Sequence, residues 1–465
     1  MTNTKLVSCT VFALSFVAVA FAQEEGRQGP PSDGAPKDFV LPAKDVFGLE
    51  NGLQATLIPF GDVPKATVNV IVRSGNLNEG DQTWLADLSG DFFLEGTTSR
   101  SGEDVARAAA AIGGQITVAI NEDQTTISGD VLAEFAPQMI ELLAEVVRSP
   151  AFDESELERL KRDRLRQLSV AQTQPQQMAI VAFRKALYGD HPYGRVLPNE
   201  AQLAAYSLDD VRNFYNNNFG AQRTQVYVAG VFDAESTRAT ITDSFTSWEE
   251  GPEVLINIPE PTSGKVVVVV VDRPGASQSN VILGLPTVSP DHDDRIAVQI
   301  SNTLLGGYFS SRITANIRED KGYTYSPFSA LSTRYKDSYW AQTAAISTSD
   351  TGPALKEIMY EIDNLQKNPP PVEELDGVKN YAAGIFVLQN STRNGIINVL
   401  NQIDLQELPD TYLTDYVSNV FAITPEQVSE MTSKYLRQDD MTLTVVGDRG
   451  QISEQVAPYI EAEGE

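Results

Sequence analysis

The sequence predicts an α+β protein built from two homologous domains, each a mixed or antiparallel sheet packed with helices. One pattern occurs twice, because 207 to 424 and 230 to 447 both span 217 positions. Ser207 and Thr424 each begin a helix with capping-box spacing, and the β-branched strands that follow end at Gly230 and Gly447. A cap, a helix, a strand and a glycine that recur at one offset of domain size indicate a duplicated domain.

Each half begins with strand-forming residues and continues with helices. β-Branched runs bounded by turn residues predict strands, and apolar residues at helical spacing predict helices. In the first half we expect strands 54–58 and 66–72, a hairpin over 116–132, and helices 105–112 and 134–147. In the second half we expect strands 266–271 and 280–285 and helices 296–305 and 354–365. Strands mixed with packed helices in both halves favour the α+β class.

The first 22 residues have the features of a secretory signal. Lys5 supplies the positive charge, residues 11–20 form an apolar core, and Ala20-Phe21-Ala22 is an A-x-A cleavage site. We therefore expect an exported protein, periplasmic or extracellular, with no membrane anchor. The single cysteine, Cys9, would leave with the signal, so neither a disulfide nor thiolate chemistry is expected.

Composition suggests the remaining boundaries. Residues 23–44 are polar and rich in Gly and Pro, which predicts a disordered lead-in. The first domain is then expected over 45–250, a linker over 251–264 and the second domain over 265–465. With 63 acidic residues against 35 Lys and Arg, the net charge is -28. Such an acidic chain argues against nucleic acid or anionic lipid as a partner.

The segment LLGGYFSSRITANIREDKGYTYS places an arginine and a tyrosine around a helix end. Ser310 and Ser311 can cap the start of the helix, and Gly322 suits the left-handed position that ends it. Arg318 then lies in the last turn, and Tyr325 lies beyond it in an extended segment. A guanidinium and a phenol can both donate hydrogen bonds to a developing oxyanion. The plainer interpretation is that Arg318 offsets the helix dipole and Tyr325 is half-buried packing.

Four motifs together resemble the pitrilysin/insulinase family of metallopeptidases, the inverzincins. They are Asn51-Gly52-Leu53, LEGT at 94–97, YGDHPYG at 188–194, and the Gly-Gly to Tyr segment over 305–325. The resemblance extends over nearly the whole mature chain and is closest to the two-domain bacterial and mitochondrial-processing-peptidase-like branch. It implies two α+β domains arranged as a half-clamshell.

In that family an H-x-x-E-H motif on a helix before the segment matching 94–97 binds zinc. A glutamate further along completes the ligands. The matching positions here read Asp87-Leu88-Ser89-Gly90-Asp91, so aspartates replace both histidines and Gly90 replaces the general base. The third ligand position is best matched by Gln167. The resemblance therefore implies a degenerate zinc site and no metal cofactor in this chain.

Asp87 and Asp91 lie at i and i+4, on one face of the expected helix. That pair would accept a hard cation such as Ca²⁺, but no third acid is identifiable beside it. We favour a mutually repelling carboxylate pair in a hydrated cleft. His191 and His292 both lie in segments rich in turn residues, and we interpret them as surface or turn residues instead of ligands.

In the family, residues matching Arg318 and Tyr325 bind substrate and stabilise the tetrahedral intermediate across a closed chamber. Many bacterial members divide the labour between a zinc-bearing subunit and a homologous partner that carries the Arg/Tyr pair. We therefore expect a non-catalytic subunit of an exported heterodimeric zinc peptidase, which would act on peptides with the zinc in its partner. The alternatives are a purely structural or peptide-binding homologue without a role in proteolysis, and a self-sufficient peptidase with an unorthodox metal.

Overall fold

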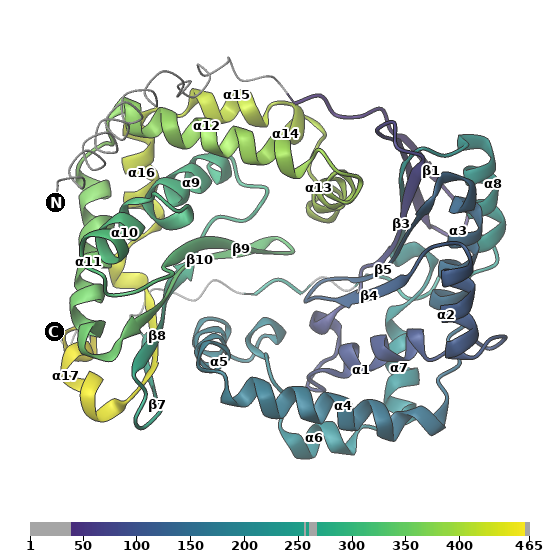
Figure 1. Cartoon of the computed structure of the whole chain (residues 1–465), viewed down its shortest axis with the longest axis horizontal. Coiled ribbons are helices and arrows are strands. Elements are labelled where there is room, and N and C mark those ends of the chain that lie inside the picture. Colours follow the sequence, from purple (N-terminus) through teal and green to yellow (C-terminus); the bar gives the residue numbers. More distant parts are fainter. Residues whose placement is uncertain (1–38, 255–256, 260–266, 461–465) are drawn as a thin grey trace, which may run out of the picture. The chain divides into compact units, whose positions relative to one another are not determined.

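The computed structural model describes residues 39–254, 257–259 and 267–460, which form two mixed sheets flanked by helices (Figure 1). The described residues belong to one compact unit. The predicted signal peptide, most of the predicted lead-in and half of the predicted linker lie outside the described residues. Within the described ranges, none of the helices is both long enough and apolar enough to span a membrane.

The first sheet has six strands in the order β1-β2-β6-β3-β5-β4. Strands β2 and β6 are parallel, and the other neighbours are antiparallel. Strand β4, half of the predicted hairpin, forms one edge. The strands are β1 Asp45–Gly48, β2 Gln54–Pro59, β3 Lys65–Val72, β4 Ile116–Ile120, β5 Thr125–Leu132 and β6 Thr224–Gly230.

The second sheet has five strands in the order β7-β11-β8-β10-β9, with β7 and β11 parallel. It repeats the first sheet without β1, since β2, β6, β3, β5 and β4 correspond to β7, β11, β8, β10 and β9. The α+β class and the duplicated sheet are confirmed. The strands are β7 Val267–Asp272, β8 Gln278–Pro286, β9 Phe328–Arg334, β10 Asp337–Ser347 and β11 Thr442–Gly447.

Helices surround both sheets, and the two predicted capping boxes are present. The Ser207 hydroxyl accepts a hydrogen bond from the Asp210 backbone N–H, and Thr424 accepts one from Gln427. The helices of the first half are α1 Leu85–Asp91, α2 Gly102–Ala111, α3 Ala136–Arg148, α4 Glu154–Thr173, α5 Pro175–Tyr188, α6 Glu200–Ala205, α7 Leu208–Asn218 and α8 Ala234–Phe245. Those of the second half are α9 Arg295–Asn302, α10 Arg312–Thr314, α11 Thr351–Lys367, α12 Val372–Gln389, α13 Arg393–Gln406, α14 Thr411–Thr414, α15 Tyr416–Ala422, α16 Pro425–Tyr435 and α17 Arg449–Ile460.

Each half lends one helix to the sheet of the other half. Helix α5 buries Phe183 against Ile282 and Val446 of the second sheet. Helix α13 buries Ile396 and Leu400, together with other apolar residues, against the face of the first sheet that carries Tyr227. Because apolar burial is the main favourable term in folding, this exchange joins the two halves. The helical periodicity of α5 and α13 does not show which sheet each helix covers.

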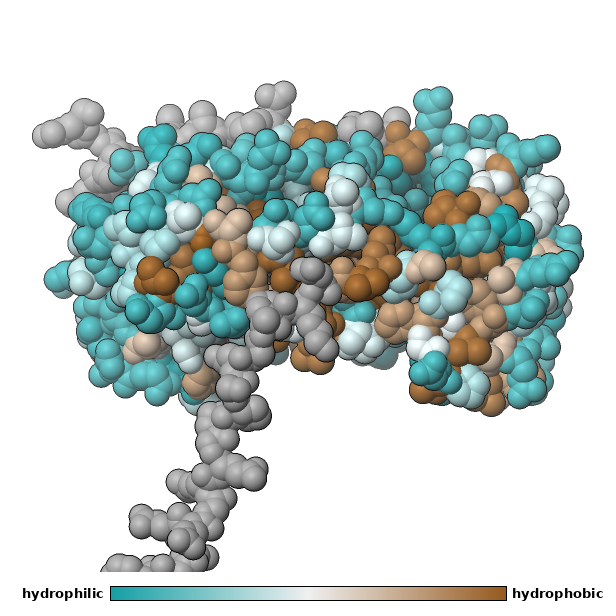
Figure 2. Space-filling view, turned by 90° about the horizontal axis from the view of Figure 1, so that it is seen from above, coloured by the Kyte–Doolittle hydropathy of each residue, from teal (hydrophilic) through white to brown (hydrophobic). Residues whose placement is uncertain are grey.

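The tips of the two edge hairpins also contact each other. Glu122, in the β4–β5 loop, accepts hydrogen bonds from Arg184 (2.7 Å) and from Arg334 (2.9 Å) at the end of β9. Asp123 accepts one from the Tyr335 backbone N–H at 3.1 Å. On the face drawn in Figure 2, hydrophilic residues predominate and apolar residues are interspersed among them.

Candidate functional site

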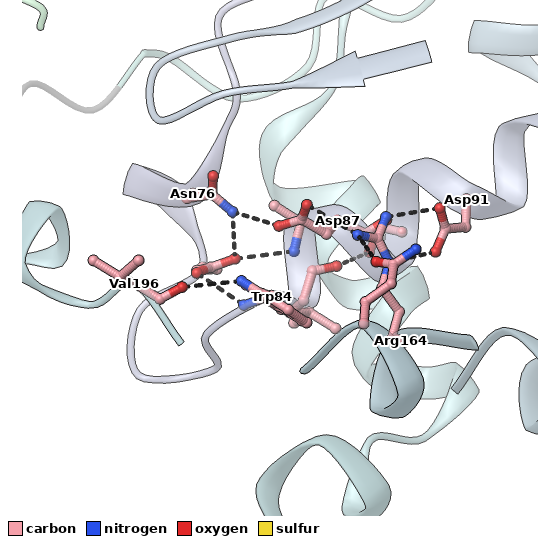
Figure 3. A network of polar contacts seen from close by, with 11 residues as sticks. Asn76, Trp84, Asp87, Asp91, Arg164 and Val196 are labelled. Atoms are coloured by element: carbon pink, nitrogen blue, oxygen red, sulfur yellow. Dashed lines mark hydrogen bonds and ion pairs between the residues drawn. The ribbon is translucent and has the colours of Figure 1, made fainter. Parts of the chain in front are cut away.

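Helix α1 presents Asp87 and Asp91 on one face, as the spacing predicts, while Leu85 and Leu88 are buried in the core. The helix begins after Trp84, whose backbone is left-handed with φ of 67°. The Trp84 indole N–H donates to the Val196 carbonyl at 3.0 Å, which anchors the start of the helix (Figure 3).

The guanidinium of Arg164, on helix α4, lies between the two aspartates (Figure 3). Its Nε donates to Asp91 Oδ2 at 2.6 Å and its Nη2 to Asp91 Oδ1 at 2.7 Å, a bidentate pair. Its Nη1 reaches Asp87 Oδ1 at 3.3 Å. Two carboxylates from one helix therefore share a single cation from another.

The third degenerate position, Gln167, meets the same guanidinium. Arg164 Nη1 donates to Gln167 Oε1 at 3.2 Å, and Nη2 donates to the Asp87 carbonyl at 2.9 Å. The expectation of an unpaired, repelling pair is therefore corrected, because Arg164 neutralises the repulsion between Asp87 and Asp91. Sequence reasoning missed Arg164. The available signal was its position three residues before Gln167, on the same helical face.

Burial and ion pairing have opposite effects on the pKa values of the side chains in this cluster. Burial raises the pKa of Asp87 and of Asp91, and the charge of Arg164 opposes that rise. For Arg164 burial lowers the pKa, but hydrogen bonds to Asp91 and the charges of both aspartates raise it overall. The guanidinium is therefore held in its charged form.

A buried polar chain extends from Asp87 away from Arg164. The Asn76 side-chain amide donates to Asp87 Oδ2 at 2.8 Å and to Glu79 Oε2 at 3.2 Å. Glu79 also accepts the backbone N–H groups of Trp84 and Ala86, each at 3.1 Å. Burial raises the pKa of Glu79 to about 8 in spite of these donors.

Gly90, which matches the position of the general base, faces edge strand β4. A Cβ atom added at Gly90 would lie 2.2 Å from Ile120 Cδ1 and 3.0 Å from Ile120 Cγ1. These separations are well below ordinary carbon–carbon contact of about 3.5–4.0 Å. A glutamate cannot enter here unless Ile120 moves.

The residues at this site do not fit zinc. Zinc sites use Cys, His and carboxylate ligands, whereas a guanidinium already binds both carboxylates here. Among the described residues neither histidine pairs with Asp87 or Asp91: His191 Nδ1 accepts the Tyr193 backbone N–H and His292 Nδ1 accepts that of Asp294. In the described ranges, no group of three or more His, Cys, Asp or Glu side chains is arranged to hold a metal ion.

A polar cavity of about 360 Å³ adjoins this cluster. Asp87 and Gln167 lie on its wall, as do Trp84, Glu122 and Arg184. Both charge signs are present in the lining, so the cavity offers hydrogen-bond donors and acceptors next to the degenerate site.

Arg318 and Tyr325 lie where the sequence places them, although the helix before Tyr325 is irregular. Helix α10 passes into a π-helical turn, Ala315–Asp320, with Arg318 near its end. Gly322 is left-handed, with φ of 68°, and ends the turn as predicted. Ser311 is the N-cap residue, as predicted, but its hydroxyl bonds the Thr314 side chain at 2.9 Å and caps no backbone N–H.

The Arg318 guanidinium lies between two aromatic rings. Its central carbon is 4.2 Å from the centroid of Phe309 and 5.0 Å from that of Tyr325, and its Nε pairs with Glu319 at 3.2 Å. Tyr325 is 79% exposed and Phe309 66% exposed, so the interpretation of Tyr325 as half-buried packing is wrong. Tyr325 is presented to solvent, and Arg318, whose side chain is 21% exposed, is held beside it by stacking. Its catalytic role stays a prediction.

Two family models match the chain in succession. Residues 61–200 match "Insulinase (Peptidase family M16)", and residues 205–381 match "Peptidase M16 inactive domain". The chain thus belongs to the M16 (insulinase) peptidase family, with an N-terminal M16 domain followed by the inactive C-terminal domain.

The relatives are described as zinc proteases. The uncharacterised zinc protease YmxG of Bacillus subtilis is 24% identical over 410 residues, which is 87% of this chain and 98% of the relative. An uncharacterised zinc protease of Mycobacterium bovis is 27% identical over 377 residues, 79% of this chain and 81% of the relative.

Solved structures share the fold. A peptidase M16 inactive domain from Pseudomonas fluorescens superimposes with a TM-score of 0.79 at 22% identity, covering 87% of this chain and 98% of that one. A protease from Helicobacter pylori superimposes with a TM-score of 0.81 at 19% identity, covering 88% of this chain and all of that one.

Proposed function

We propose that this chain is the non-catalytic subunit of an exported heterodimeric zinc peptidase. One contrast carries the proposal. Arg164 binds both aspartates expected at the zinc-ligand positions, and the Ile120 side chain lies against Gly90, the residue expected at the position of the general base. Tyr325, by contrast, stays exposed, and Arg318 lies half-buried beside its ring. A chain that has lost its hydrolytic centre but still presents a donor pair is suited to assist a centre on another molecule.

The chemistry divides between the two subunits. A zinc ion on the partner would supply the nucleophilic water. This chain would close the chamber, and its Arg318 N–H and Tyr325 O–H groups would donate hydrogen bonds to the peptide carbonyl oxygen as negative charge develops there. Stacking on Phe309 orients the guanidinium before substrate arrives, which reduces the entropy lost on reaching the transition state.

The acidic chain bears on substrate choice. With a net charge of -28, it would disfavour acidic peptides in a chamber that it helps to line. Export by the predicted signal would place the complex in the periplasm or outside the cell.

The test is a reconstituted complex. A homologue from the same genome that carries H-x-x-E-H is co-expressed with this chain, and hydrolysis of a peptide library is measured. Arg318→Ala is expected to lower kcat by about 10²–10³ while leaving assembly and zinc content unchanged. Arg273→Ala is the matched control, because Arg273 is an exposed arginine of the same half. Near-wild-type hydrolysis by the Arg318→Ala complex would refute the assigned role.

A structural or peptide-binding homologue gives a different result. In that case the chain purifies without a zinc-bearing homologue, and no H-x-x-E-H chain from the genome gains activity when mixed with it. Peptide binding by the isolated chain that survives Arg318→Ala would then favour a binding role.

A further inference from the structure

We infer that the Arg164 guanidinium is a built-in cation that replaces a metal ion as the link between helices α1 and α4. The family's relatives are described as zinc proteases, whereas in this chain the Arg164 guanidinium binds the side chains of Asp87, Asp91 and Gln167, the residues expected at the ligand positions. The inference concerns the integrity of this chain alone and does not rest on the proposed function.

Arg164 makes contacts like those that a metal ion makes. Five oxygen atoms lie within 3.3 Å of its nitrogen atoms: both carboxylate oxygens of Asp91, one carboxylate oxygen and the carbonyl oxygen of Asp87, and the amide oxygen of Gln167. These oxygens come from two separate helices. A bidentate guanidinium fixes their geometry as well as their charge, which a lysine ammonium would not do.

The surroundings make a cation at this point necessary. Asp87 and Asp91 carry the same charge on adjacent turns of α1, and Glu95 and Glu122 add further negative potential. Among the described residues, Arg164 is the only cationic side chain that forms an ion pair with either aspartate. Its own side chain is 14% exposed, so water screens these interactions weakly.

Removal of the guanidinium would leave a cluster of oxygen atoms without a cation. Carboxylate and amide oxygens suit hard ions such as Ca²⁺ and Mn²⁺. The wild-type chain should therefore be indifferent to divalent ions, and a variant that lacks the guanidinium should become sensitive to them.

The experiment is thermal unfolding of the metal-stripped chain in EDTA, in CaCl₂ and in MnCl₂. The test variant is Arg164→Met, which keeps most of the aliphatic stem and removes the charge. Its Tm in EDTA is expected to fall by about 5 °C or more and to recover at least in part when CaCl₂ or MnCl₂ is added. Arg162→Ala is the matched control, because Arg162 is exposed on the same helix. Wild type and Arg162→Ala should show the same Tm in all three conditions.

A second variant distinguishes ion binding at this cluster from other effects of the salts on stability. Arg164→Met combined with Asp91→Ala removes the Asp91 carboxylate as a ligand, and the Tm of this double variant should no longer respond to the ions. Three results would overturn the inference: a wild-type Tm that EDTA lowers, an Arg164→Met Tm equal to that of wild type, and a lowered Tm that neither ion restores. If Arg164→Met does not fold in EDTA, folding in CaCl₂ or MnCl₂ supports the inference, and failure to fold in either salt overturns it.

Discussion

Replacing Gly90 by alanine tests whether the position of the general base is closed. Gly90 lies inside α1, where alanine is intrinsically better than glycine by about 1 kcal/mol. The new Cβ would overlap Ile120 Cδ1 at 2.2 Å and crowd Cγ1 at 3.0 Å. Forcing Ile120 off its rotamer and overpacking this contact together cost about 1–3 kcal/mol. Gly90→Ala should therefore destabilise wild type by about 1 kcal/mol.

The effect of Gly90→Ala on the free energy of unfolding should change sign when the overlapping methyl group of Ile120 is removed. Ile120→Val deletes Cδ1, so in that background Gly90→Ala is expected to be neutral or stabilising. A double-mutant cycle, measured by urea unfolding with circular dichroism, should give a coupling energy of about 1 kcal/mol. Val118 provides the control, since its Cγ1 lies at an ordinary 3.7 Å from the added Cβ. Gly90→Ala and Val118→Ala should be additive within about 0.5 kcal/mol.

Additivity between Gly90→Ala and Ile120→Val would refute the steric argument. Equal stabilisation of both backgrounds by Gly90→Ala would be one form of this additivity and would also refute the argument. With the coupling present, restoring a glutamate at this position requires a change in strand β4 as well, because the glutamate side chain is larger than a methyl group.

Two further predictions concern buried charges. Burial raises the pKa of Glu79 from its usual 4.5 to about 8, so the folded chain keeps a proton that the unfolded chain releases. The contribution of Glu79 to the free energy of unfolding is therefore full below about pH 4.5 and is lost as the pH rises through 8, by at most about 5 kcal/mol. Glu79→Gln should flatten this part of the pH dependence of urea midpoints. Glu122→Ala should destabilise by about 3–5 kcal/mol in urea, because it leaves Arg184 and Arg334 unpaired with side chains only 9% and 13% exposed. A decrease in the free energy of unfolding of less than about 1 kcal/mol would show that the Glu122 ion pairs do not stabilise the contact between the hairpin tips.

Local patterns predicted much of the fold. The offset between Ser207 and Thr424 predicted the duplication that the two sheets display, because caps and strand ends are read from neighbouring residues. The placement of Arg318 and Tyr325 around Gly322 was predicted for the same reason. The position of the helix start at Ser311 was also predicted, but its hydroxyl bonds a side chain instead of the backbone.

The sequence by itself, through its resemblance to the family, predicted that Asp87, Gly90, Asp91 and Gln167 stand at the metal and base positions, in place of the histidines and the glutamate of the motif. Only the tertiary structure decided what fills their place. Arg164 lies 73 positions from Asp91, and Ile120 lies 30 positions beyond Gly90, so no local periodicity brings either into contact. The packing of α5 and α13 against the sheet of the opposite half was likewise decided only by the tertiary structure. An apolar helical face shows that a helix is buried, and long-range packing selects the surface that buries it.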